Sequence, residues 1–129
     1  MEFSIKTRVY LEDTDAQGIV YYVNYLKFME RARTEFMRHY GYDFQRLAEQ
    51  DGHFVVHNMS VQYLKAATMD DDLCITVTIH KLARTYIVFS QKVMRAEEIL
   101  CKAEIKVACI GATSSRPMAI PDSIVNNLK

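Results

Sequence analysis

The chain has 129 residues and half of them are apolar, which is enough for one domain with a core of its own, so we expect a single domain over residues 1–129. Its 16 Lys and Arg residues balance its 16 Asp and Glu residues. A net charge of zero removes the long-range attraction that nucleic-acid-binding proteins rely on, and it leaves little repulsion between copies. We therefore expect no nucleic-acid partner.

The three cysteines, Cys74, Cys101 and Cys109, are odd in number and lack a Cys-x-x-Cys spacing. This usage argues against a disulfide framework and a structural zinc site, and it is typical of a reducing compartment. The N-terminal segment has no apolar run, and the chain has no stretch of about 18 apolar residues. We expect a cytoplasmic protein without a signal peptide or a membrane span.

Hydrophobic periodicity predicts the first elements. Residues 3–11 alternate as in a half-buried strand, with Leu11 on the apolar side. Residues 12–18 have the composition of a turn, and after them apolar residues recur at helical spacing over residues 22–40. This pattern predicts an amphipathic helix of about five turns. Its expected outer face carries Lys27, Glu30, Arg31, Arg33, Glu35 and Arg38.

Strand-type sequence dominates the rest of the chain. A short helix is expected over residues 44–50, followed by strands over residues 54–64, 73–81, 85–94 and 99–110, and a helix that begins at Asp122 and Ser123. Short connections favour antiparallel pairing of consecutive strands. The order predicts an α+β fold with one long helix on a five-stranded antiparallel sheet. Because such a sheet has exposed edges, we expect a homo-oligomer, either a dimer or a tetramer.

The segment EDTDAQGIVYYVNY, residues 12–25, is the candidate site. Three carboxylates precede Gly18 and the long helix, and a helix N-terminus offers unpaired N–H groups and a partial positive charge to an oxyanion or a phosphate. Helix capping and Asx turns would explain Asp13 and Asp15 without chemistry. However, Asp15 lies seven residues before Tyr22, too far for a cap at that residue.

The pattern Asp-Thr-Asp-x-x-Gly-x-Val-Tyr-Tyr-x-x-Tyr, followed by Phe28 and the run Glu30-Arg31-Ala32-Arg33, resembles the hotdog-fold acyl-CoA thioesterases of the 4-hydroxybenzoyl-CoA thioesterase type. Within these the chain is similar to the Tol-Pal-associated acyl-CoA thioesterase branch, over nearly its whole length. The resemblance implies a hotdog fold, in which a five-stranded antiparallel sheet wraps one long central helix. It also implies a hydrolase, without a cofactor, that converts an acyl-CoA into a free acid and coenzyme A.

The resemblance also assigns roles to residues of the motif. Asp15 matches the catalytic carboxylate, and the N–H of Tyr22 matches the donor to the thioester carbonyl. The branch commonly has His where this chain has Tyr22, so the resemblance carries over the backbone donor at this position and not the imidazole. Asp15 can attack the carbonyl or activate water, and the sequence leaves both open. Gly18, Val20 and Tyr25 are the expected substrate contacts within the motif.

Coenzyme A carries phosphates, so cations in predicted loops are candidate ligands for it, and Lys65 and Arg84 are the two that we select. Acyl carrier protein is an alternative carrier of the acyl group. No metal site is expected, because His53 and His57 would lie about 13 Å apart on a strand. The alternative function is a non-catalytic protein of membrane-lipid metabolism that binds acyl thioesters or acts as an adaptor.

Overall fold

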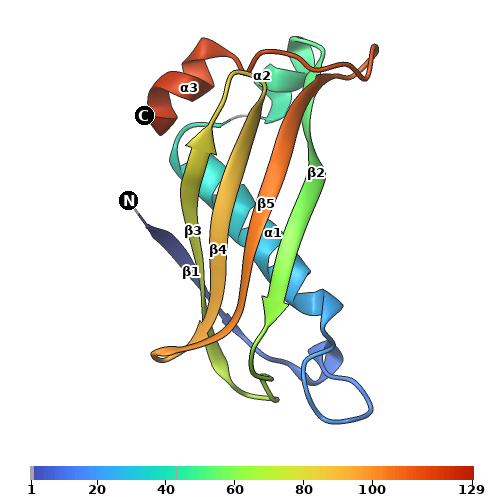
Figure 1. Ribbon diagram of the computed structural model, residues 1–129, viewed down its shortest axis with the longest axis vertical. Helices are drawn as coiled ribbons and strands as arrows, with labels where there is room; N and C mark the ends of the chain where they lie inside the picture. The colour runs from blue at the N-terminus through green and yellow to red at the C-terminus, as the bar shows by residue number, and fades with distance from the viewer. Residues whose placement is uncertain (1, 43) are drawn as a thin grey trace.

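A single antiparallel sheet covers one side of the long helix α1 in the computed structural model, which describes residues 2–42 and 44–129 (Figure 1). The elements are β1 (Phe3–Arg8), η1 (Leu11–Asp13), α1 (Val23–His39), α2 (Phe44–Glu49), β2 (Gly52–Tyr63), β3 (Asp72–Leu82), β4 (Tyr86–Arg95), β5 (Glu98–Gly111) and α3 (Asp122–Leu128). The predicted α+β order and the five-stranded antiparallel sheet are confirmed. No described helix is long and apolar enough to cross a membrane.

The strand order is β1-β3-β4-β5-β2, and every neighbouring pair is antiparallel. Consecutive pairing, as predicted, holds for β3 with β4 and for β4 with β5. It is wrong for β2, which pairs with β5 at the far edge of the sheet. The connection over residues 64–71 therefore crosses about 14 Å, three strand spacings, which eight extended residues span easily because they reach about 26 Å.

β1 ends at Arg8, three residues earlier than the alternation predicts. The N–H of Val9 donates to the carbonyl of Asp71, and the chain then turns into η1. The carboxylate of Asp13 accepts a hydrogen bond from the N–H of Tyr10 at 2.9 Å. This polar contact stabilises the turn, so Leu11 is 72% exposed instead of buried, and its predicted place on the apolar side of a strand is wrong.

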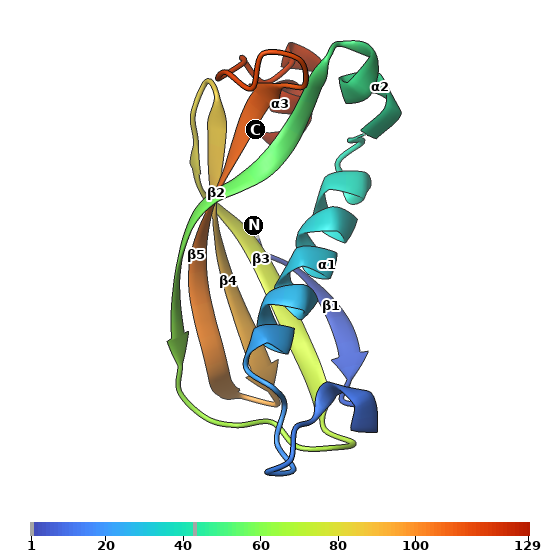
Figure 2. The same cartoon turned by 90° about the vertical axis from the view of Figure 1, so that its right-hand side faces the viewer.

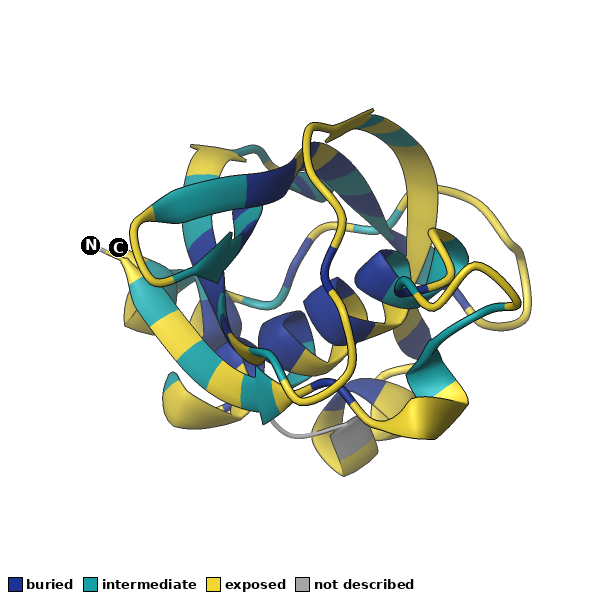
Figure 3. Ribbon diagram, turned by 90° about the horizontal axis from the view of Figure 1, so that it is seen from below, coloured by how far each residue is buried: buried dark blue, intermediate teal, exposed yellow. Residues whose placement is uncertain are grey.

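The helix α1 packs its buried face on the concave side of the sheet (Figure 2), and the buried residues gather between helix and strands (Figure 3). Arg33 belongs to this face and is only 8% exposed, so its predicted outward position is wrong. It lies four residues after Met29 and four before Met37, which places it on the buried stripe. Its Nη1 donates to the Oε1 of Gln91 at 2.9 Å.

A β-bulge bends β2 along its length (Figure 2). The register of β2 against β5 shifts between Val56 and Asn58. The alternation of inward and outward side chains therefore restarts after the bulge. The side chains that point toward α1 are those of Phe54 and Val56 before the bulge and Met59 after it. β2 forms one edge of the sheet and β1 forms the other.

Candidate active site

Residues 14–20 form a narrow turn that leads into α1. Thr14 and Val20 form an isolated antiparallel β-bridge, and the N–H of Asp15 donates to the carbonyl of Ile19 at 2.9 Å. The N–H of Gly18 donates a hydrogen bond to the carbonyl of Asp15 at 3.0 Å, which closes a four-residue turn. Gly18 has a φ of +81°, which L-residues with a side chain rarely adopt, so the turn requires a glycine here.

The carboxylate of Asp15 is half-buried and has two different oxygens. Oδ1 accepts a hydrogen bond from the N–H of Gln17 at 2.8 Å, which is the Asx turn that the sequence suggests as a local role. Oδ2 has no hydrogen-bond partner among the described residues. One oxygen thus holds the side chain in place while the other is available to a ligand.

Asp13 has a structural role on both sides of this turn. Its carboxylate stabilises η1, as described above, and its carbonyl accepts hydrogen bonds from the N–H of Tyr21 and from Nδ2 of Asn24, each at 2.9 Å. Sequence analysis did not select Asn24, because its bond to Asp13 joins residues eleven positions apart and depends on how the turn folds back. These bonds attach the start of α1 to the turn that carries Asp15.

Tyr22 is the N-cap residue of α1, with φ −56° and ψ −29°. Its N–H has no partner among the described residues, as expected at a helix start, where the helix dipole places partial positive charge. Its side chain is 57% exposed and its ring centroid lies 5.7 Å from that of Tyr63. Sequence reasoning missed Tyr63, because only the fold brings the end of β2 to the start of α1.

Val20 and Tyr25 are buried and hold the 64–71 connection against the helix start. The N–H of Val20 donates to the carbonyl of Ala67, and the N–H of Ala67 donates to the hydroxyl of Tyr25, both at 2.9 Å. Burial raises the pKa of Tyr25, so its hydroxyl stays protonated at neutral pH. Both residues form the protein framework of the site, and their contacts with substrate stay predictions.

The two selected cations lie at different ends of the sheet. Lys65 lies two residues after Tyr63, the last residue of β2, and its Nζ forms an exposed ion pair with Glu98 at 2.8 Å. Arg84 lies in the β3–β4 turn, at the end of the sheet opposite the start of α1 (Figure 1). Within one chain the structure brings Lys65, but not Arg84, to the end that carries the motif.

The buried thiols Cys101 and Cys109 are poor candidates for a nucleophile. Burial raises the pKa of Cys101 to about 11 and also raises the pKa of Cys109. Both thiols are therefore protonated at neutral pH, and the thiolate is the nucleophilic form.

Residues 17–102 match the sequence model of the thioesterase superfamily, which is about two thirds of the chain. The chain belongs to the thioesterase superfamily. Among other superfamily proteins, the acyl-CoA thioester hydrolase YbgC of Escherichia coli O6:H1 is 42% identical over 128 residues, which cover 98% of this chain and 96% of that protein. The acyl-CoA thioesterase YbgC of Haemophilus influenzae is also 42% identical, over 95% of this chain and 90% of that protein.

Solved structures show the same fold. A hypothetical protein from Aquifex aeolicus superposes with a TM-score of 0.90 at 29% identity, covering 98% of this superfamily member and 99% of that chain. A 4-hydroxybenzoyl-CoA thioesterase in complex with 4-hydroxybenzoyl-CoA superposes with a TM-score of 0.89 at 20% identity, covering 99% of each chain. The predicted hotdog fold is confirmed.

Proposed function

We propose that this protein hydrolyses the thioester of an acyl-CoA to a free acid and coenzyme A. The observation that supports this most directly is that one short segment carries two groups without a hydrogen-bond partner among the described residues: the Oδ2 of Asp15, an acceptor, and the N–H of Tyr22, a donor. Full-length similarity to acyl-CoA thioester hydrolases points to the same reaction.

The chemistry follows from these two groups. Attack on the thioester carbonyl places negative charge on its oxygen, and the N–H of Tyr22 at the positive helix start stabilises that charge. Asp15 supplies the attacking oxygen itself, giving a mixed anhydride that water then hydrolyses, or it takes a proton from the attacking water. Either route breaks the C–S bond and releases the coenzyme A thiol.

Lys65 is the cation that we assign to the phosphates of coenzyme A. Both side chains of the Lys65–Glu98 ion pair are exposed, so the pair contributes little to stability. A phosphate can therefore take the place of the Glu98 carboxylate at Lys65. Arg84 does not fit this role for the site of its own chain. Coenzyme A is our choice of carrier over acyl carrier protein, because the relatives named above are acyl-CoA hydrolases.

The working unit that we propose is a homo-oligomer paired through the free edge of β2. Val55 and Val56 on this edge strand are 37% and 47% exposed, and an apolar edge invites pairing with another strand. The three cysteines are free thiols, which fits a reducing compartment, and we place the protein in the cytoplasm.

A panel of acyl-CoA thioesters tests the activity, with the released thiol as the readout. We expect steady release of coenzyme A from at least one short, long or aromatic acyl-CoA, well above the rate without protein. Binding of the thioesters without thiol release would contradict hydrolysis and favour the non-catalytic alternative.

A further inference from the structure

Arg33 is a buried cation that makes no ion pair within the described residues, although the charge of the nearby Glu30 acts on it. The side chain is 8% exposed, and the only hydrogen bond that the described residues give it is to the neutral amide of Gln91. Gln91 is itself oriented, because its Nε2 donates to the carbonyl of Met29 at 3.0 Å. A charge taken out of water normally has an opposite charge bonded to it, and among the described residues no carboxylate is hydrogen-bonded to Arg33.

Arg33 lines a cavity and has donors that its hydrogen bond to Gln91 does not use. Gln91 occupies Nη1, which leaves the Nε and Nη2 edge of the guanidinium, the fork that fits a carboxylate. No fully buried polar side-chain atom among the described residues lacks a hydrogen-bond partner. The free N–H groups of Arg33 are therefore not fully buried, and the residue lines a cavity. Burial lowers the pKa of Arg33, but a guanidinium stays charged at neutral pH.

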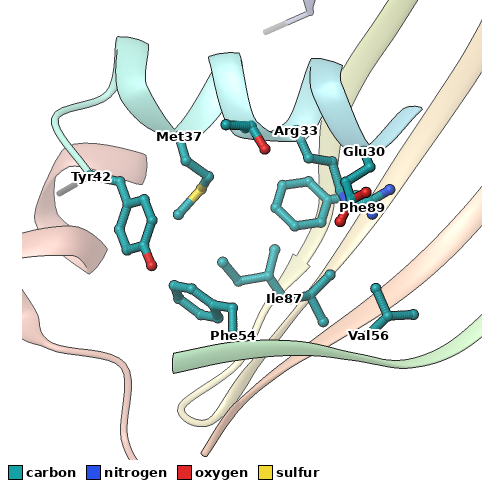
Figure 4. A pocket seen from close by; sticks show the side chains of 10 residues that line it. Glu30, Arg33, Met37, Tyr42, Phe54, Val56, Ile87 and Phe89 are labelled. Atoms are coloured by element: carbon teal, nitrogen blue, oxygen red, sulfur yellow. The ribbon is translucent and has the colours of Figure 1, made fainter. Parts of the chain in front are cut away.

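This cavity, which we call the Arg33 pocket, lies between α1 and strands β2 and β4 and has a volume of about 160 Å³ (Figure 4). A cavity of about 150 Å³ holds benzene in another protein, so the pocket suits a ligand with a ring-sized body. Figure 4 shows Arg33 and Glu30 at one end and Tyr42 at the other. Its largely apolar walls include Met37, Tyr42, Phe54, Val56, Ile87 and Phe89.

The pocket is separate from the candidate active site of the same chain. Arg33 follows Tyr22 by eleven residues, which is about 16 Å along the axis of a helix. Two further polar residues line the pocket, Glu30 and Thr34. Glu30 is exposed, so water screens its charge more than that of the buried Arg33.

We propose that the Arg33 pocket binds a carboxylate on a ring-sized apolar body, with the carboxylate on the free edge of Arg33. The carboxylate would supply a counter-charge bonded directly to Arg33, and the apolar walls would hold the body. The source that the geometry allows is a free carboxylic acid.

Benzoate and benzamide are the matched probes, because they share a ring and differ in charge. We expect the wild-type protein to bind benzoate at least about tenfold more tightly than benzamide, since a charge-assisted hydrogen bond contributes that much. Titrations followed by NMR of labelled methionine methyl groups report the binding, and Met37 in the wall locates it. Equal affinity for the two probes, or shifts that leave Met37 unchanged, would overturn the proposal.

Two variants separate the charges. Arg33→Met keeps the length of the side chain and should remove the preference for benzoate, after circular dichroism has shown a folded protein. Glu30→Gln changes only an exposed residue, so folding is not at risk, and it should tighten benzoate binding about threefold by removing a like charge. Weaker benzoate binding by Glu30→Gln would contradict a carboxylate at this end of the pocket.

A short acyl group held at Tyr22 cannot cover the distance of about 16 Å to Arg33, so the ligand is a free acid and turnover does not report on the pocket. The benzoate titration tests the pocket without turnover. Absence of turnover with every thioester would contradict the proposed function alone, whereas absence of benzoate binding would contradict the pocket alone.

Discussion

Asp15 and Asp13 make similar local hydrogen bonds, but they differ in their structural role and in the carboxylate oxygen that a ligand could contact. Each carboxylate accepts one backbone N–H at 2.8 or 2.9 Å, Asp15 from Gln17 and Asp13 from Tyr10. The backbone carbonyl of Asp13 holds the start of α1 as well, whereas the Oδ2 of Asp15 has no partner among the residues that the structure describes. The two positions therefore form a matched pair for mutation.

Asp15→Asn should lower kcat by about 10²–10⁴-fold while the fold is kept, because a general base or a nucleophile contributes at least that much. The Asn carbonyl can still accept the N–H of Gln17, so the turn is preserved. Asp13→Asn preserves its own hydrogen bond in the same way and should change kcat far less. Thiol-release kinetics of the two variants measure the difference, and wild-type turnover by Asp15→Asn would eliminate this mechanism.

The backbone at Tyr22 allows its N–H to be removed selectively. Its φ of −56° is close to that of proline, and replacing Tyr22 by proline breaks no hydrogen bond of this N–H within the described part of the chain. Tyr22→Pro should therefore lower kcat by about 10²–10³-fold, the usual contribution of one oxyanion donor. Tyr22→Phe removes only the hydroxyl and should keep most of the activity.

Because proline also restricts Tyr21, a thermal melt must first show that Tyr22→Pro is folded. An active, folded Tyr22→Pro together with an inactive Tyr22→Phe would mean that the side chain, and not the backbone, is the functional group.

At the scale of elements, the 64–71 connection is what joins the motif to the sheet. The carboxylate of Asp71 accepts hydrogen bonds from the N–H of Thr68 at 2.8 Å and from Arg95 at 2.7 Å. Arg95 also donates to the carbonyl of Ala66 at 3.3 Å. The neighbouring Ala67 bonds Val20 and Tyr25, as described above, so this ion pair supports the framework of the site.

The pair predicts a pH-dependent stability. Burial by itself raises the pKa of Asp71, but the hydrogen bond from Thr68 and the charge of Arg95 outweigh burial, and the pKa is lowered in the folded protein. A carboxyl with a lowered folded pKa adds stability above its unfolded pKa of about 3.9, and that stability is lost as the pH falls through the folded pKa.

Asp71→Asn should therefore lower the Tm at pH 7 by about 3–8 °C, which corresponds to about 1–2 kcal/mol. The difference from wild type should shrink below about pH 4. Asp70→Asn is the control, because its exposed side chain makes no hydrogen bond within the described residues and its φ of +71° suits Asn. Thermal melts at pH 7 and pH 3 measure both, and an equal effect of Asp71→Asn at the two pH values would refute the linkage.

At the scale of the whole molecule, the two sheet edges differ in character. The β2 edge carries the exposed Val55 and Val56, whereas exposed residues of the β1 edge include Ser4 and Lys6. Lysine on an edge strand discourages pairing with another chain. Combined with a net charge of zero, this asymmetry favours association through β2.

We expect no stable monomer at micromolar concentration, so light scattering after size exclusion should report at least twice the 15.0 kDa of one chain. Val55→Lys places a charge on the β2 edge and should shift the protein toward monomer. Ser4→Lys makes the same change on the β1 edge and should leave the mass unchanged. A wild-type mass of 15 kDa would contradict the oligomer, and an effect of Ser4→Lys alone would place the interface on the other edge.

The sequence by itself determined the kinds and order of the elements, because periods of 3.6 and 2 residues reflect which side of a helix or strand is buried. It also identified the Asp15 to Tyr25 segment, whose chemistry is local: a turn, an Asx bond and a helix start lie within eleven residues. Only the tertiary structure decided the pairing of β2 with β5, since strand order depends on contacts between residues far apart in the chain. It also decided the burial of Arg33 against Gln91, because a charged side chain is expected at the surface unless a polar partner, here on another element, compensates for its burial. The position of Arg84 far from the motif likewise depends on the tertiary structure, since it follows from the direction in which β3 runs.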